Sequence, residues 1–372
     1  MVPPFLVIFT NIVSKLSLVN SISSSVSNQQ IRDALHDWKN IVSKYQVADA
    51  KKATIQLINS FGPFIGLWIL IYFSLDWSIF LAIPLLLINA FFLVRIFIIQ
   101  HDCGHQSFFN SKALNNAVGT ICSFFCGIPY KYWAKVHNFH HGHNGQLEVR
   151  DVGDIPTLTV KEYLSKSKPG KFFYRVWRNP IVLFGIAPMY YIIITNRYNK
   201  EFGKNLKITR NQILNNLGIF VVYAILGYLL GWAKFLTIQL SIIFFFGIIA
   251  FWFFYVQHQH ESAYKEWRDK WDFLIASIKG SSYYKLPRVW HWLTGNIGYH
   301  HIHHLNSLIP NYNLPKCYKE NPILNKYVTE ITFFKSLSMY KHKLWDEDLK
   351  KMVSFKQLKN KYKQMNKSRS AL

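Results

Sequence analysis

The stretch His101-Asp102-Cys103-Gly104-His105 follows directly on a long apolar run, and the interpretation of the whole chain starts from it. On an α-helix, residues four positions apart lie about 40° from each other, so His101 and His105 can face one target. Two later clusters repeat this pattern, with histidines at positions i, i+3 and i+4 of a predicted helix. These clusters are His137-Asn138-Phe139-His140-His141 and His300-His301-Ile302-His303-His304.

Eight histidines in this helical register predict a metal centre. Neutral imidazole is the commonest protein ligand for metals, and a structural zinc site closes with only four ligands. Eight imidazoles therefore suit two metal ions, each with an open position, although imidazole alone does not choose between iron, zinc, copper and nickel. The Glu-x-x-His motif of soluble di-iron bundles does not occur in the sequence. The predicted ligands are His101, His105, His137, His140, His141, His300, His303 and His304.

The other histidines are sorted by their position in the chain. His258 ends the last long apolar run at the same predicted depth as the three clusters, which makes it a candidate ninth ligand. His260 lies about 200° further round a continuing helix, so the two are not expected to face one site. His301 fits either a place beside the ligands or ordinary packing, and His143 either a place beside the ligands or a surface loop. A register in which His301 and His304 bind stays open. We expect structural roles for His36, His291 and His342.

Composition places the chain in a membrane. Half of its 372 residues are hydrophobic and 17% are aromatic, yet its formal net charge is +24. This combination is ordinary in a membrane protein, because apolar spans lie in lipid while Lys and Arg gather on the cytoplasmic side. Nucleic-acid binding is the competing explanation of the charge, but no nucleic-acid motif occurs and the basic residues lie outside the apolar runs. We therefore expect no nucleic-acid partner.

Four apolar runs are long enough to cross a bilayer. They extend from about residue 53 to 75, 78 to 100, 213 to 232 and 235 to 256. A run of about 22 residues covers roughly 33 Å, which matches a bilayer core. Very short turns within each pair, the second of them at Ala233-Lys234, predict two hairpins. Residues 115–130 and 179–195 are apolar but short and contain proline, so we expect interfacial or re-entrant segments there.

Basic residues indicate the orientation of the spans. The region before the first run, the loop 197–210 and the lysine-rich end after residue 316 all lie on one side of both hairpins. The positive-inside rule assigns that side to the cytosol, and the three histidine clusters lie on it. The predicted fold is an all-α membrane protein with four transmembrane helices in two hairpins and a cytosolic helical cap that carries the histidine clusters.

Three regions are predicted along the chain. Residues 1–52 form an N-terminal leader, with no positive charge ahead of its apolar core, followed by a basic pre-membrane helix over 31–52. Residues 53–330 form the membrane domain. Residues 331–372 form a basic C-terminal tail, which is either a solvated, partly helical end or an amphipathic helix on anionic lipid.

The three clusters resemble the three histidine boxes of the membrane fatty acid desaturases. The likeness extends to residues 152–160, 280–287, 293–298 and 309–314, which are similar to segments of the bacterial acyl-lipid desaturases of the Δ12/ω-6 and Δ5 types. It covers roughly residues 50–330. The box spacing and the hairpin topology are specific for the superfamily, whereas they say little about the position of the double bond.

The resemblance implies a di-iron centre that activates O2 and removes two hydrogens from adjacent methylenes of an acyl chain, leaving a cis double bond. It implies that the eight box histidines bind the two Fe ions and that His258 matches an additional family ligand. The substrate would be an acyl-lipid or acyl-CoA, held in a dry apolar tunnel beside the metals. The active site would face the cytosol, at a bacterial inner membrane or the endoplasmic reticulum.

The resemblance also implies an external electron donor. Family members use ferredoxin or cytochrome b5, and this sequence has no His-Pro-Gly-Gly haem motif of a fused cytochrome b5 domain. A separate donor is therefore expected. Both kinds of donor are acidic, so the basic cytosolic face is suited to attract them, although the same charge would also fix topology and bind lipid headgroups.

Two other functions stay open on the residues alone. A membrane hydroxylase or ketolase with the same histidine boxes is one, although residues 280–298 and 309–314 favour desaturation. A membrane metal transporter is the other. Transporters place their ligands near the bilayer midplane on broken spans, whereas these histidines lie at the ends of spans, which disfavours that function.

Overall fold

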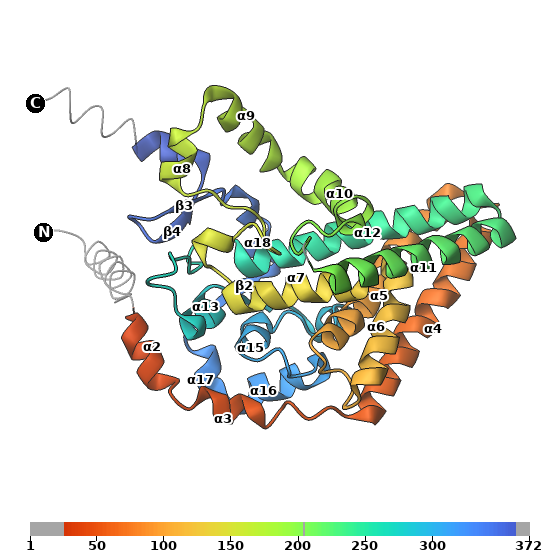
Figure 1. Cartoon of the computed structure of the whole chain (residues 1–372), viewed down its shortest axis with the longest axis horizontal. Helices are drawn as coiled ribbons and strands as arrows, with labels where there is room; N and C mark the ends of the chain where they lie inside the picture. Colours follow the sequence, from red (N-terminus) through yellow and green to blue (C-terminus); the bar gives the residue numbers. More distant parts are fainter. Residues whose placement is uncertain (1–25, 204, 362–372) are drawn as a thin grey trace, which may run out of the picture.

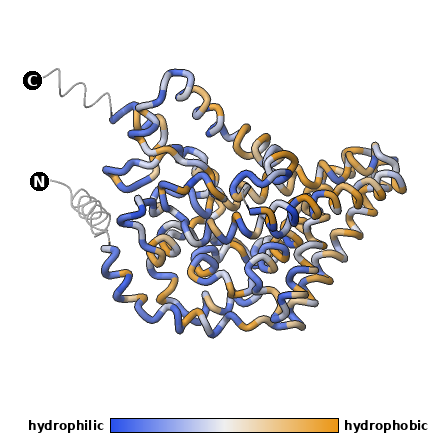
Figure 2. The backbone as a smooth tube through the Cα atoms, viewed as in Figure 1, coloured by the Kyte–Doolittle hydropathy of each residue, from blue (hydrophilic) through white to orange (hydrophobic). Residues whose placement is uncertain are grey.

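The computed structural model describes residues 26–203 and 205–361. Four long helices lie together at one end of the molecule, and shorter helices with two small sheets form a cap at the other end (Figure 1). Hydrophobic residues follow the long helices, while hydrophilic residues are concentrated in the cap (Figure 2). The molecule thus has an apolar end and a polar end, as a protein embedded in a membrane requires.

The four long helices confirm the predicted spans and hairpins. Each is long and apolar enough to cross a membrane. The second hairpin turns at Gly231, whose φ of +83° is a backbone conformation that other residues adopt only with strain, rather than at the predicted Ala233-Lys234. The helices are α4 (Ala50–Ser74), α5 (Ile79–Gly104), α11 (Leu206–Leu230) and α12 (Trp232–His258).

The inner and outer spans differ in burial. In their most apolar stretches, 56% of α5 and 39% of α12 is buried, against 17% of α4 and 11% of α11. Helices α5 and α12 therefore form the centre of the bundle. The outer surface carries large apolar side chains such as Phe80 and Phe220, which are 80% and 70% exposed. Such exposure is expected where the surroundings are lipid.

Two helical pairs near the spans are not straight crossings, as the short proline-containing runs predicted. Helix α6 (Lys112–Cys126) packs against α5 and ends at Gly127, after which α7 (Tyr130–His143) returns toward the cap. Helix α9 (Lys168–Trp177) and the segment that follows it are bent by 59°. That segment consists of the π-helical turn η2 (Val182–Ile186), α10 (Ala187–Ile193) and the 3-10 turn η3 (Thr195–Arg197).

The cap is built from short elements. Strand β1 (Ser282–Lys285) pairs in parallel with β2 (Thr329–Thr332), and β3 (Leu344–Asp346) pairs antiparallel with β4 (Lys351–Val353). Its helices are α2 (Asn28–Ala34), α3 (Trp38–Ser43), α8 (Val160–Ser165), α13 (Phe273–Lys279), α14 (Arg288–Leu293), α15 (His300–Leu305), α16 (Leu314–Glu320), α17 (Pro322–Asn325) and α18 (Phe333–Ser336). The 3-10 turns of the cap are η1 (Leu147–Val149), η4 (Asn311–Asn313) and η5 (Met339–Lys341).

Two predicted segments differ from the structure. Residues 31–52 do not form one helix: α2 and α3 are separate, and α4 already begins at Ala50, where the Asp49 carboxylate caps the Lys52 N–H at 3.0 Å. Residues 335–353 are not a solvated end, because they include the β3–β4 hairpin, whereas residues 355–361 are helical. The β3–β4 hairpin is held in the cap by Leu344 and Trp345, which are 0% and 2% exposed. The predicted leader up to residue 25 and the tail beyond 361 lie outside the described residues.

Candidate metal centre

Four helices bring nine histidines to one place, where the spans meet the cap. Helix α5 ends there with His101 and its C-cap residue His105, α12 ends with His258, and α7 and α15 each contribute three of the nine. All nine side chains are between 1% and 9% exposed. The eight predicted ligands and the candidate ninth therefore lie together.

The ring nitrogens form two groups. In the first, which we call group A, one nitrogen from each of five rings lies within 4.8 Å of all the others. Group A consists of His101, His105, His137, His141 and His303. In group B the same limit holds for His140, His258 and His304. His300 completes group B, because its Nε2 lies 2.9 Å from that of His258 and 3.1 Å from that of His304.

The donor atoms fit two metal ions. Among the described residues, His101 Nε2, both ring nitrogens of His105 and His303 Nε2 are buried without a hydrogen-bond partner. A buried polar atom without a partner costs about 1–3 kcal/mol, so a group that binds the free lone pairs gathered here would stabilise the site. Metal ions accept such lone pairs. The rings of His141 and His304, 4.1 Å apart, bring groups A and B into contact.

Burial favours the neutral form of seven of these imidazoles. It lowers the pKa of His105, His137 and His141 well below 6.5, and neighbouring histidines lower it further. For His140, burial lowers the pKa to about 4. The same causes lower the pKa of His300, His303 and His304 well below 6.5. Only a neutral imidazole has a free lone pair for a metal, so the site is prepared for ligation at neutral pH.

Hydrogen bonds orient two of the rings. His101 Nδ1 lies 2.9 Å from Oδ1 of Asp102, and Oδ2 of the same carboxylate accepts from the backbone and side-chain N–H groups of Asn311 at 2.6 and 2.8 Å. His258 Nδ1 lies 3.2 Å from the carbonyl oxygen of Gly280. When Nδ1–H donates outward, Nε2 presents its lone pair inward, which is the usual arrangement of metal-binding histidines. The sequence reading assigned no role to Asp102 or Asn311.

Other histidines lie outside both groups. His260 belongs to neither group, and its Nδ1 lies 3.3 Å from the Ser262 hydroxyl. His301 lies on the other side of α15, where its Nε2 is 3.1 Å from Asn325 Oδ1, so the register that uses His301 is not the one formed. Four more histidines lie outside groups A and B: His36, His143, His291 and His342.

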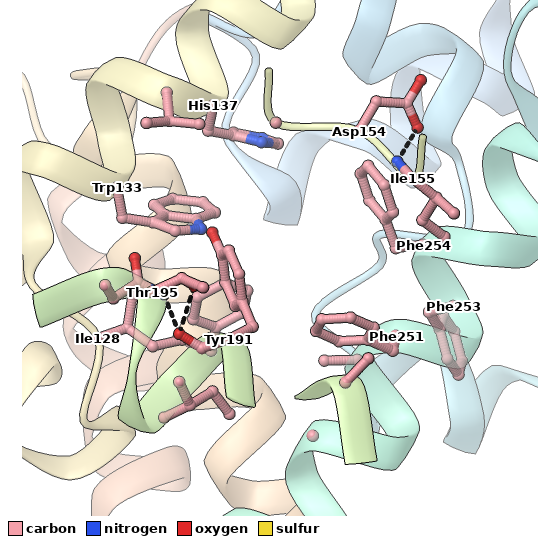
Figure 3. Close-up of a pocket in the computed structure, with 18 of the residues that line it drawn as sticks. Ile128, Trp133, His137, Asp154, Ile155, Tyr191, Thr195, Phe251, Phe253 and Phe254 are labelled. Atoms are coloured by element: carbon pink, nitrogen blue, oxygen red, sulfur yellow. Dashed lines mark hydrogen bonds between the residues drawn. The ribbon is translucent and has the colours of Figure 1, made fainter. Parts of the chain in front are cut away.

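An apolar cavity of about 400 Å³ opens beside the histidines. His101, His137 and His300 form part of its wall. Figure 3 shows His137 and Trp133 on one side of the cavity and Phe254 on the opposite side. The polar residues of its lining include Asp151, Asp154, Lys200 and Glu201.

The cavity continues along the spans. Gln257 and Phe246 both line it and lie eleven positions apart on α12, which corresponds to roughly 16 Å at 1.5 Å per residue. An elongated space with aromatic and aliphatic walls suits an aliphatic chain. The arrangement can therefore hold such a chain next to two metal ions and away from water.

Known proteins are similar to this chain in sequence. A protein-family model described as fatty acid desaturase matches residues 55–335. A fatty acid desaturase of Bacillus subtilis is 44% identical over 319 residues, which are 86% of this chain and 90% of the relative. An sn-1 oleoyl-lipid 12-desaturase of Picosynechococcus is 25% identical over 305 residues, 78% of this chain and 82% of the relative. A chloroplastic sn-2 acyl-lipid omega-3 desaturase (ferredoxin) of Arabidopsis thaliana is 28% identical over 253 residues, 63% of this chain and 54% of the relative.

The extent of these matches settles the family. The family model covers well over half of the 372 residues, from the first span to the short helix α18. The Bacillus relative is matched over nine-tenths of its length. This chain belongs to the fatty acid desaturase family.

Proposed function

We propose that the protein is an acyl-lipid desaturase that introduces a cis double bond into a fatty acyl chain, with O2 and two electrons, at a di-iron centre. The observation that carries this proposal is the convergence of nine buried histidines on an elongated apolar cavity. The names of the Picosynechococcus and Arabidopsis relatives support an acyl-lipid substrate.

We assign the five histidines of group A to one iron and the four of group B to the other. Bound iron would supply O2 activation and redox chemistry, which an alkyl C–H bond requires because it offers no acidic proton to a side-chain base. The protein supplies neutral ligands in fixed positions. The Asp102 carboxylate holds the His101 ring at the Nδ1 of that ring, and Asn311 holds Asp102 in turn.

The cavity wall positions the acyl chain. Aromatic rings such as Trp133 and Phe254 restrict the chain to the space beside His137 (Figure 3). The same rings exclude water, which protects a reactive site from side reactions. The residues of the cavity wall therefore select which pair of methylenes of the acyl chain reaches the metals. The distance from the deep end of the cavity to the histidines limits this choice.

Electron counting requires a donor. Reduction of O2 to two water molecules takes four electrons, of which the two hydrogens removed from the acyl chain bring two. The other two come from outside, and we propose a separate ferredoxin or cytochrome b5 on the cytosolic face. The Arabidopsis relative is named an sn-2 acyl-lipid omega-3 desaturase (ferredoxin), which favours that donor.

Expression in a bacterium that lacks acyl-lipid desaturases tests the proposal. Gas chromatography of fatty acid methyl esters should show new cis-unsaturated products, and mass spectrometry of derivatives should locate the double bond. Hydroxylated products in place of unsaturated ones would replace the proposal by the hydroxylase alternative. Bound metal without any new lipid would contradict an oxidative function.

A further inference from the structure

Helix α7 separates the proposed metal centre from solvent on one side. Its exposed residues Lys131, Lys135, Asn138 and Gly142 are spaced by four, three and four positions, which places them along one face. We call these four residues the α7 face. The group A ligands of the same helix point to its other side. The metal centre is therefore one helix away from the surface here.

The backbone of α7 is open to an approaching partner at Gly142. No atom of the described residues lies within 4 Å of a Cβ built on Gly142, so a partner can approach the backbone there. Asn138 ties the face to the end of α5, because its Nδ2 donates to the Gly104 carbonyl at 3.2 Å. A helix is about 10–12 Å across with its side chains, so a cofactor docked on this face would lie at short range from the ligands.

The charge carried by helix α7 is positive. Helix α7 carries Lys131 and Lys135 and no acidic residue. Within residues 26–203 and 205–361, neither lysine has a carboxylate within 4.0 Å, and Lys135 Nζ instead lies 5.9 Å over the Phe202 ring. With a net charge of +24 on the whole chain, this face favours an acidic partner.

We propose that the α7 face is the docking site of a small acidic one-electron carrier protein of the ferredoxin class, which reduces the metal centre across α7. This inference rests on the proposed function. Each turnover oxidises two reduced carriers, and their two electrons, with two protons from solvent and the two hydrogens of the acyl chain, convert one O2 to two water molecules. Because a one-electron carrier must dock twice, the interface should be small, transient and sensitive to salt.

Two variants test the docking site, each with a matched control. Gly142→Trp fills the open space and holds the carrier away, whereas Gly142→Ala leaves it nearly open. Lys135→Glu reverses a charge on the face, and Lys359→Glu reverses an exposed charge elsewhere on the cap. Reduced plant-type [2Fe–2S] ferredoxin is mixed with each purified iron-loaded enzyme in detergent, and ferredoxin oxidation is followed by stopped flow. Ferredoxin binding to the iron-free enzymes is measured by surface plasmon resonance.

Gly142→Trp should slow electron transfer from ferredoxin about tenfold or more, while reduction of the iron by dithionite stays at the wild-type rate. Lys135→Glu should weaken ferredoxin binding about tenfold and flatten its salt dependence. Wild-type behaviour of both variants would overturn the docking site. A ferredoxin-binding defect of Lys135→Glu that occurs only with enzyme in anionic vesicles would also overturn the docking site, because it would assign the lysine to lipid headgroups. Product formed by a wild-type enzyme that does not bind ferredoxin would overturn this inference alone, whereas no product with any reductant would overturn the proposed function.

Discussion

Asp102 shows how a single side chain can control a metal site that it does not enter. Its two oxygens join His101 on one side to Asn311 on the other. Replacement by Asn keeps the shape but removes the negative charge that favours an outward Nδ1–H on His101. We expect Asp102→Asn to lower iron affinity about 10–100-fold. Iron retention against a chelator measures this, and Asp269→Asn, at an exposed position, should behave like the wild type. Equal retention in both variants would contradict the positioning role.

Ligand replacement separates the two classes of histidine. His140 is 2% exposed and belongs to group B, whereas His36 is exposed and its Nδ1 bonds the Asp33 carbonyl at 2.9 Å. We expect His140→Ala to abolish product and lower bound iron, because a missing ligand removes the metal rather than only slowing the reaction. His36→Ala should be nearly silent. Metal analysis and product chromatography on both variants check the assignment, which full activity of His140→Ala would refute.

The ligands could be predicted from the sequence and their supports could not. Spacings of three and four residues are local, and helical periodicity converts them directly into a shared face. The partner of Asp102 lies 209 residues away, so only the folded chain reveals it. The split of nine histidines into groups A and B has the same origin, because group A forms only after α7, α15 and the end of α5 have packed together.

At the scale of elements, the contact between α10 and α12 defines the deep part of the cavity. A Cβ on Gly247 would lie 2.8 Å from Pro188 Cβ, and Gly247 lines the cavity. Gly247→Val should therefore shorten the cavity and cost about 1–3 kcal/mol through overpacking. We expect products from long acyl chains to fall about tenfold relative to those from short chains.

The chain-length profile of the unsaturated products, measured by gas chromatography, checks this expectation. Gly62→Val on α4 is the matched control, since nothing in the described residues lies within 4 Å of a Cβ there. An equal loss at every chain length in Gly247→Val would indicate damaged packing rather than a changed cavity.

Helices and strands that depend on local sequence patterns could be predicted, whereas those that depend on distant contacts could not. Long apolar runs identified all four spans, since length and hydropathy alone decide whether a helix can cross lipid. The β3–β4 hairpin was missed because the tail around it is rich in lysine and its stability comes from distant contacts. Trp345, for example, donates its backbone N–H to the Leu158 carbonyl at 3.0 Å, far away in the sequence.

For the whole molecule, the buried neutral histidines predict a loss of stability in acid. Burial lowers the pKa of His140 and of His301 from 6.5 to about 4. Above pH 6.5 both the folded and the unfolded chain leave these groups unprotonated, so pH has no effect through them. Between pH 6.5 and 4 the unfolded chain binds protons that the folded chain does not, so stability falls as the pH falls. Each pKa unit corresponds to about 1.4 kcal/mol. Each group therefore lowers the free energy of unfolding in acid by on the order of 3 kcal/mol.

Thermal unfolding of the iron-free enzyme in detergent, measured between pH 7.5 and 4.5, tests this dependence. The unfolding midpoint should decrease steadily below pH 6.5 and stay level above it. The iron-loaded enzyme should lose metal over the same range, because protons compete for the same nitrogens. A midpoint that is level down to pH 4.5 would show that these histidines take up protons within the folded protein.

The orientation in the membrane follows from charge on the scale of the whole chain. With 43 Lys and Arg against 19 Asp and Glu, and most of them outside the spans, the cap should face the cytosol.

Labelling of introduced cysteines tests this orientation. The four native cysteines are buried, so labelling of a new surface cysteine reports the side of the membrane on which it lies. In intact bacteria, Trp77→Cys, at a position 86% exposed in the α4–α5 turn, should react with a membrane-impermeant maleimide. Lys359→Cys in the cap should react only in inverted vesicles. The opposite pattern would place the histidines outside the cell, beyond the reach of a cytosolic electron donor.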